Sequence, residues 1–111
     1  MAQYPSSLDQ VFGALADSTR RGVVDALGRG PASVGELAQT ATMTLPSFMK
    51  HLHTLERSGL IHTAKSGRVR TCTLDRTSLG VVEGWLADQR AIWEGRTDRL
   101  EQFVTDPEEP S

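Results

Sequence analysis

Apolar residues recur along most of the chain at the three- and four-residue spacing of amphipathic helices. The first stripe predicts a short helix over residues 8–16, and the next predicts a helix over residues 18–27 with Asp17 as its cap. The apolar positions of the first helix are Leu8, Val11, Phe12 and Leu15. Those of the second are Val23, Val24 and Leu27.

Two further helices are predicted between residues 33 and 58, separated by a three-residue turn at residues 42–44. Ser33 and Glu36 form a capping box, in which each side chain can bind a free backbone amide at the start of the helix. Thr44 can cap the next helix, and Pro46 in its first turn lacks only an amide hydrogen that would have no helical partner there. One side of this next helix is apolar, with Phe48, Leu52 and Leu55.

Strand-like sequence follows over residues 60–64 and 69–74, joined by the tip Lys65-Ser-Gly-Arg68. Residues 77–104 then predict one long helix without proline. Its apolar positions are Val82, Trp85, Leu86, Ile92, Trp93, Leu100 and Phe103. Because this helix has more apolar surface than one small domain can cover, we expect a second copy of the chain to bury the remainder.

The order helix, turn, helix, hairpin is typical of a winged helix-turn-helix, a fold that places the exposed face of its second helix in the DNA major groove. We therefore predict a mainly α fold with a small β-hairpin and a long C-terminal dimerisation helix. The 111 residues suffice for one domain, which we place at residues 8–104. Residues 1–7 and the acidic tail at residues 105–111 are expected to be flexible ends.

The distribution of charge supports a nucleic-acid partner more than its total does. The formal net charge is −2, which by itself argues against DNA binding. Residues 44–76, however, hold six basic residues against two acidic ones, whereas residues 77–111 hold three against eight. Such a separation favours one orientation on a phosphate backbone, with the acidic C-terminal part held away from it.

Cysteine usage and hydropathy favour a cytoplasmic protein. Cys72 is the only cysteine, so no disulfide can form within the chain. No stretch approaches the roughly 20 apolar residues that span a bilayer, and the N-terminus lacks the basic start and apolar run of an export signal.

The helix beginning at Leu45 carries the strongest functional signal. Its polar side offers hydroxyls, Lys50, His53 and the apolar Met49, which suit base edges, phosphates and thymine methyls. In the hairpin, Arg68 and Arg70 alternate along one strand face and would reach the minor groove or its phosphates. The alternatives are an ordinary solvated helix face and hairpin, in a winged-helix module that binds a protein partner.

Other chemistry has less support. Arg20 and Arg21 lie at the helix end that disfavours cations, which suggests an ion pair, a phosphate contact or simply a solvated pair. His51 lies at the edge of the apolar side and is interpreted as an orienting histidine that binds backbone or phosphate. The histidines and Cys72 do not have metal-ligand spacing, so no metal and no cofactor is expected. No catalytic motif is present, and we expect no enzyme.

Trp85 and Trp93 leave two interpretations open. They could wall a small-molecule pocket between dimer helices, or they could be ordinary aromatic residues of a helix–helix contact. Nothing in the sequence indicates an inducer.

Four segments together resemble the ArsR-type winged-helix repressors of bacteria and archaea: ADSTRRGVVDAL, VGELAQ, TLPSFMKHLHTLERSGLI and KSGRVRTCTL. The resemblance spans about residues 8–74, and the run KHL-x-x-LE-x-x-GL is fairly specific to that family. The C-terminal segment WLADQRAIWEGRTDRLEQFV is similar to a metal-independent branch.

The resemblance implies a transcriptional repressor that binds double-stranded DNA, as a homodimer on a palindromic operator. The DNA contacts that it implies are Thr44, Leu45, Ser47, Met49, Lys50, His53, Arg68 and Arg70. The dimer contacts expected on the first and last helices are Leu8, Val11, Phe12, Val82, Trp85, Leu86, Trp93 and Leu100.

The sequence departs from the family pattern in two places. Leu45 and Met49 stand where many members carry Gln and Ser, so apolar contacts should contribute more to base reading. Residues 36–39, Glu-Leu-Ala-Gln, stand where metal-sensing members have a Cys-x-Cys pair, and the last helix lacks the His and acidic ligands of the other common metal site.

Overall fold

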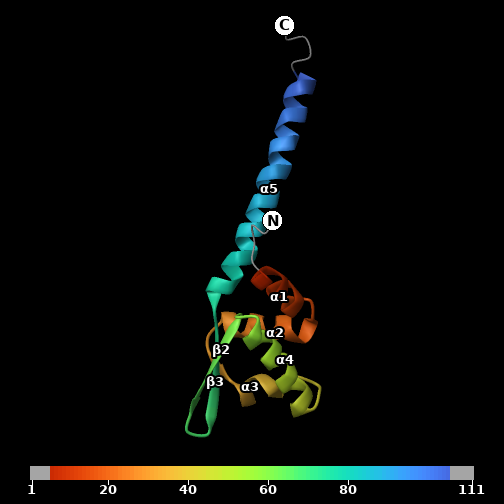
Figure 1. Cartoon of the computed structure of the whole chain (residues 1–111). Coiled ribbons are helices and arrows are strands. Elements are labelled where there is room, and N and C mark those ends of the chain that lie inside the picture. The colour runs from red at the N-terminus through yellow and green to blue at the C-terminus, as the bar shows by residue number, and fades with distance from the viewer. Residues whose placement is uncertain (1–5, 106–111) are drawn as a thin grey trace.

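The computed structural model describes residues 6–105, and side chains for residues 7–96. Five helices and three short strands are present in this part of the chain, arranged as a small domain from which one helix projects (Figure 1). In chain order the elements are α1 (Ser6–Leu15), α2 (Ser18–Gly28), β1 (Ala32–Ser33), α3 (Val34–Gln39), α4 (Leu45–Arg57), β2 (Ile61–Ser66), β3 (Val69–Leu74) and α5 (Arg76–Thr105). The predicted fold class, mainly α with a hairpin and a long last helix, is confirmed.

The helix starts are set by the caps that the sequence predicts. The Asp17 side chain accepts a hydrogen bond from the backbone N–H of Arg20 and caps α2. Ser33 and Glu36 form the expected capping box at α3. Thr44 caps α4 by accepting from the backbone N–H of Ser47. These bonds satisfy amides that have no partner within their own helices.

One apolar core lies where α1, α2, α3 and α4 meet the sheet. The buried side of α4 is Phe48, Leu52 and Leu55, as predicted. The other core residues are Val11, Ala14, Val23, Leu27, Leu37, Leu60, Ile61 and Cys72. Val24, half-buried, packs against this core from its edge. Because α4 inserts three of its side chains here, its orientation is fixed by the whole domain.

The sheet contains a strand that the sequence pattern does not predict. Its order is β1-β3-β2, with all neighbours antiparallel, and Ala32 of β1 pairs with Cys72 of β3. Two residues are too few to show the alternation that identifies a strand. Pairing with β1 covers an edge of β3 and joins the hairpin to the start of α3.

A close approach between Gly59 and Ser78 joins the end of α4 to α5. Gly59 has a φ of +84°, which ends α4 in a backbone conformation that favours glycine. The hydroxyl of Ser78 donates to the carbonyl oxygen of Gly59 at 2.7 Å, and a Cβ on Gly59 would lie 2.8 Å from that hydroxyl. This contact therefore fixes the first turn of α5 against the end of α4.

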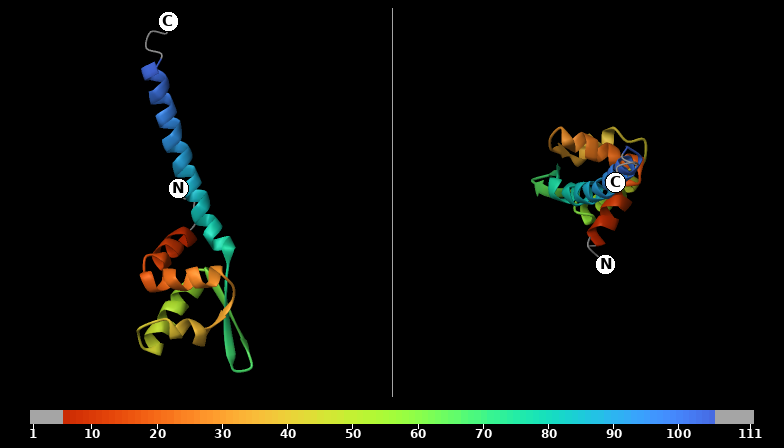
Figure 2. Two further views of the ribbon diagram at one scale, coloured as in Figure 1. Left: turned by 180° about the vertical axis from the view of Figure 1, so that it is seen from behind. Right: turned by 90° about the horizontal axis from the view of Figure 1, so that it is seen from above.

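Beyond its first turns α5 extends away from the domain (Figures 1 and 2). The ring of Trp85 meets that of Phe12 edge to face, with centroids 5.6 Å apart. The radius of gyration is 20.5 Å, compared with about 13 Å for a compact domain of 100 residues. None of the helices in the described region combines the length and the hydropathy needed to span a bilayer.

The flexible ends predicted for residues 1–7 and 105–111 lie mainly outside the described residues. Within the described part, α1 already includes Ser6 and Ser7, and α5 extends to Thr105. Helix α3 ends at Gln39, and Ala41, just after it, packs partly buried against the core.

Candidate nucleic-acid interface

Helix α4 presents a continuous exposed face on the side opposite its buried residues. Leu45 is 56% exposed and Met49 37% exposed, unusually high values for apolar side chains. Lys50 and His53 are also exposed. Lys50 and Arg57 take part in no ion pair among residues 7–96. The face therefore combines unpaired positive charge with apolar side chains able to contact bases.

The first turn of α4 adds two hydroxyl groups to this face. The Thr44 hydroxyl donates to the Ser47 hydroxyl oxygen at 3.1 Å, while Thr44 also accepts from the Ser47 backbone amide at 3.3 Å. Because Thr44 uses its only hydrogen on Ser47, the exposed Ser47 hydroxyl keeps its own hydrogen for an external acceptor. Thr44 is thus mainly a capping residue, and Ser47 is the better placed of the two to donate outward.

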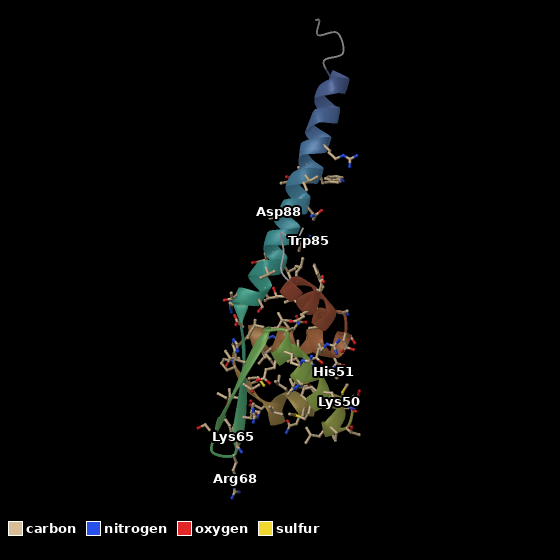
Figure 3. All side chains as sticks on the ribbon, viewed as in Figure 1. Lys50, His51, Lys65, Arg68, Trp85 and Asp88 are labelled. Atoms are coloured by element: carbon tan, nitrogen blue, oxygen red, sulfur yellow. The ribbon has the colours of Figure 1, made fainter. Side chains whose placement is uncertain are left out.

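The hairpin of β2 and β3 carries the second cationic group. It turns at Gly67 and Arg68, and the φ of +64° at Gly67 suits the first central position of a type II′ turn. Figure 3 shows Lys65 and Arg68 at the tip of the hairpin, at the same end of the molecule as Lys50 on α4. Arg70, by contrast, lies on β3 beside Thr63, with its Nη1 atom 3.0 Å from the Thr63 hydroxyl oxygen.

His51 makes a side-chain contact that its sequence position does not reveal. Its Nδ1 atom lies 3.0 Å from Nη1 of Arg20 and 3.7 Å from the carboxylate of Asp17. It therefore has a side-chain partner in the preceding helix pair, where the sequence suggested backbone or phosphate. The backbone amide of Arg20 is the main reason that the pKa of Asp17 is lowered, and the nearby Arg20 guanidinium lowers it further.

Arg20 and Arg21 both bind backbone carbonyls, a role that the sequence did not indicate. The Arg20 Nε atom donates to the carbonyl oxygen of Ala14 at 2.7 Å, and the Arg21 Nη1 atom donates to that of Leu15 at 2.8 Å. These carbonyls end α1 and have no helical partner. Two cations unfavourably placed for their own helix therefore cap the end of the preceding one.

The residues considered for metal binding do not converge. No group of three or more His, Cys, Asp or Glu residues lies close enough for a shared ion in the described region. His62 instead binds Asp75, with Nε2 2.5 Å from the carboxylate oxygen. Cys72 is completely buried, and desolvation raises the pKa of its thiol, which disfavours the reactive thiolate.

The predicted dimer-interface residues whose side chains are described fall into three groups. Val11 is fully buried and Leu8 is 9% exposed within the chain itself, so little of either side chain is left to contact a second copy, and their place in the interface stays a prediction. Val82 and Trp85 are half-buried, Val82 against the core and Trp85 against Phe12. Phe12, Leu86 and Trp93 are the exposed members, with Trp93 67% exposed. Leu100 lies outside the residues with described side chains.

A protein-family model described as a helix-turn-helix domain matches residues 15–64. The HTH-type transcriptional regulator Rv2034 of Mycobacterium tuberculosis is 38% identical over 82 residues, covering 74% of this chain and 76% of its own. The transcriptional repressor SdpR of Bacillus subtilis is 29% identical over 79 residues, covering 71% and 88%.

Similarity also extends to solved structures. The crystal structure of an ArsR family transcriptional regulator, RHA00566, superposes with a TM-score of 0.80 and 57% sequence identity. The match covers 85% of this chain and 97% of that one, so the structural likeness includes most of the architecture described above.

Proposed function

The chain belongs to the ArsR family of winged helix-turn-helix transcriptional regulators, and from this premise we propose that it binds a palindromic operator as a homodimer and represses transcription. Helix α4 is the element proposed to enter the major groove. The β2–β3 hairpin would contact the adjacent minor groove or its phosphates. The proposed DNA contacts are Ser47, Met49, Lys50, His53, Leu45, Thr44, Arg68 and Arg70.

The exposed face of α4 is the observation that carries this proposal. Because α4 is packed through Phe48, Leu52 and Leu55, the backbone positions of its outer residues are fixed relative to the domain. Lys50, which has no ion pair among the described side chains, lies at the same end of the molecule as the hairpin tip. Helix α5, with five acidic and four basic residues, leaves from the other end (Figures 1 and 3). Phosphate attraction would therefore act on one end of the domain only.

A second copy of the chain is the partner that we propose for α5. Phe12, Leu86 and Trp93 form an exposed apolar surface along α1 and the projecting helix. A dimer would bury this surface and would set two α4 helices at a fixed separation. Two-fold protein symmetry then requires two inverted half-sites, centred about one helical turn of DNA apart or a multiple of it.

Repression is proposed because a dimer bound over a promoter would exclude RNA polymerase. The name of SdpR, a transcriptional repressor, is in keeping with this direction of regulation. We propose that no metal, cofactor or catalytic step is involved, and that the protein acts in the prokaryotic cytoplasm, where its DNA partner lies. A small-molecule inducer is not required by this proposal.

Selection from random double-stranded DNA tests the proposed function directly. We expect the purified protein to enrich one inverted repeat, with an affinity that falls steeply as salt increases because phosphate contacts release counterions. A winged-helix module that binds a protein partner predicts no enriched sequence and no tight complex even at low salt. That outcome would reject DNA binding as the function.

A further inference from the structure

Thr63 of β2 lies between two side chains of opposite charge. Its hydroxyl donates to the carboxylate of Glu56, at the end of α4, over 3.0 Å. The same oxygen accepts a hydrogen bond from Nη1 of Arg70, on the neighbouring strand, over 3.0 Å. One hydroxyl therefore links the end of the helix proposed to read DNA to a cation of the hairpin.

The chemistry of the three groups fixes the direction of both bonds. A threonine hydroxyl has a single hydrogen, and Glu56, ionised, can only accept it. Only oxygen lone pairs then remain to face Arg70, which has five N–H donors and no acceptor. Thr63 occupies one of these donors and leaves the others for an external acceptor.

The hydroxyl also keeps the two charges from pairing directly. No Arg70–Glu56 ion pair within 4.0 Å is present among the described side chains. If the hydroxyl were absent, the guanidinium would be free to move onto the carboxylate in a direct, bidentate ion pair. Such a pair would neutralise Arg70 and occupy the donors that a DNA phosphate needs.

The surroundings of Arg70 suit contact with the sugar–phosphate backbone of a bound DNA strand. Arg70 lines the groove between α4 and the sheet together with Met49 and His53 of the exposed α4 face. It is exposed and lies opposite Lys65 in the β2–β3 register, with its guanidinium held towards Thr63. Arg70 thereby presents its guanidinium to the groove beside the exposed α4 face.

We propose that Thr63 is a positioning residue for DNA binding: its hydroxyl separates Arg70 from Glu56 and aims the guanidinium at a phosphate in the groove between α4 and the hairpin. This inference rests on the proposed DNA-binding function. It assigns a role to Thr63 and Glu56, neither of which need touch DNA.

Thr63→Val tests the inference, because valine keeps the shape and strand preference of threonine but lacks the hydroxyl. The slope of log affinity against log salt is negative, and we expect its magnitude to decrease by about 0.9 for each phosphate that Arg70 no longer neutralises, as in Arg70→Ala. We expect affinity to fall roughly three- to tenfold. Thr63→Ser, which keeps the hydroxyl, should retain the wild-type slope. Thr73→Val, at an exposed β3 threonine, is the matched control and should also retain it.

Removing the carboxylate separates positioning from a general effect on the fold. In Thr63→Val with Glu56→Gln, Arg70 has no anion to pair with, so the salt slope should return towards the wild-type value. A wild-type slope in Thr63→Val alone, or no recovery in the double variant, would overturn the inference. A wild-type slope in Arg70→Ala would overturn it too while leaving DNA binding intact, whereas failure of the wild-type protein to bind DNA would reject both proposals.

Discussion

The Nη1 atom of Arg20 lies 3.0 Å from the Nδ1 atom of His51. This hydrogen bond joins α2 to α4, the helix proposed to read DNA. Because a guanidinium can only donate, Nδ1 of His51 must be the unprotonated acceptor. The other nitrogens of Arg20 donate to the carbonyl oxygens of Gly13 and Ala14 at the end of α1. Arg20 therefore joins α1, α2 and α4, so the helix expected at the dimer interface and the helix expected on DNA share one anchor.

The Arg20–His51 bond should contribute measurably to stability. His51→Leu removes the acceptor and leaves a partly buried N–H without a partner, so we expect the free energy of unfolding to fall by about 1–2 kcal/mol. His51→Asn is the control, since its amide oxygen can stand where Nδ1 does. Urea unfolding measures both variants, and equal midpoints for His51→Leu and wild type would show that the bond is not stabilising.

The pKa of Asp75 is lowered, first by its hydrogen bond from His62 and then by the backbone amide of Thr77. A carboxyl pKa that is lower in the folded state stabilises the protein at pH values above the ordinary pKa of 3.8. This contribution is lost as the pH falls through the lower, folded-state pKa. We therefore expect unfolding free energy to decrease below about pH 4, and to decrease less steeply in Asp75→Asn.

Urea unfolding between pH 3 and 6 measures this acid dependence. Asp88→Asn is the matched control, because Asp88 is exposed on α5 and makes no hydrogen bond or ion pair with the side chains that the structure describes (Figure 3). If Asp75→Asn and Asp88→Asn gave the same pH profile, the His62–Asp75 contact would not be the source of the dependence.

Lys50 should contribute to affinity through the exposed face of α4. We expect Lys50→Ala to weaken operator binding by on the order of 1–3 kcal/mol if the ammonium meets a base edge, and to relax specificity at one position of each half-site. Arg90→Ala removes an equal charge on α5, where Arg90 pairs with Glu94, and should leave binding unchanged. Fluorescence anisotropy with operator DNA compares the two variants, and equal affinities would remove Lys50 from the interface.

Arg68, at the turn of the hairpin, should contribute to DNA binding both through its charge and through its planar guanidinium, and two substitutions separate these contributions. Arg68→Ala should reduce the magnitude of the slope of log affinity against log salt by about one unit for each phosphate contact that the substitution removes. Arg68→Lys keeps the charge and should keep the slope, but should weaken a minor-groove contact that depends on the planar guanidinium. A salt titration in which Arg68→Ala behaves as wild type would show that the hairpin tip does not reach DNA.

Leu86 should lie in the proposed dimer interface, since it is 51% exposed on the projecting part of α5. We expect Leu86→Asp to shift the protein towards monomer, because burying a carboxylate in an apolar interface is costly. Ala91→Asp, on the far side of the same helix, is the control and should remain dimeric. Sedimentation velocity measures the shift, and a dimeric Leu86→Asp variant would place the interface elsewhere.

Much of the fold follows from local sequence because local interactions determine it. The caps at Asp17, Ser33 and Thr44 involve residues three positions apart, and the structure confirms all three. The buried side of α4 is confirmed for the same reason, since helical periodicity alone aligns Phe48, Leu52 and Leu55. The family resemblance is carried by these same local segments.

The candidate site is only partly local. Exposure of Lys50 and His53 follows from the α4 pattern, and position in the hairpin exposes Arg68. The Glu56–Thr63–Arg70 contact could not be predicted, because it joins a helix and two strands whose relative placement no short pattern encodes. The same is true of strand β1, whose pairing with Cys72 spans forty residues of sequence.

The sequence by itself determined where helices begin, which of their sides face inward and where positive charge gathers, because each of these depends on neighbours within one or two turns. Tertiary structure alone decided the partners of Arg20 and of Arg70, and it placed Val11 in the core while leaving Leu86 exposed. The physical reason is that hydrogen bonds and burial depend on which elements meet in space. That meeting is set by packing of the whole core, to which every helix of the domain contributes.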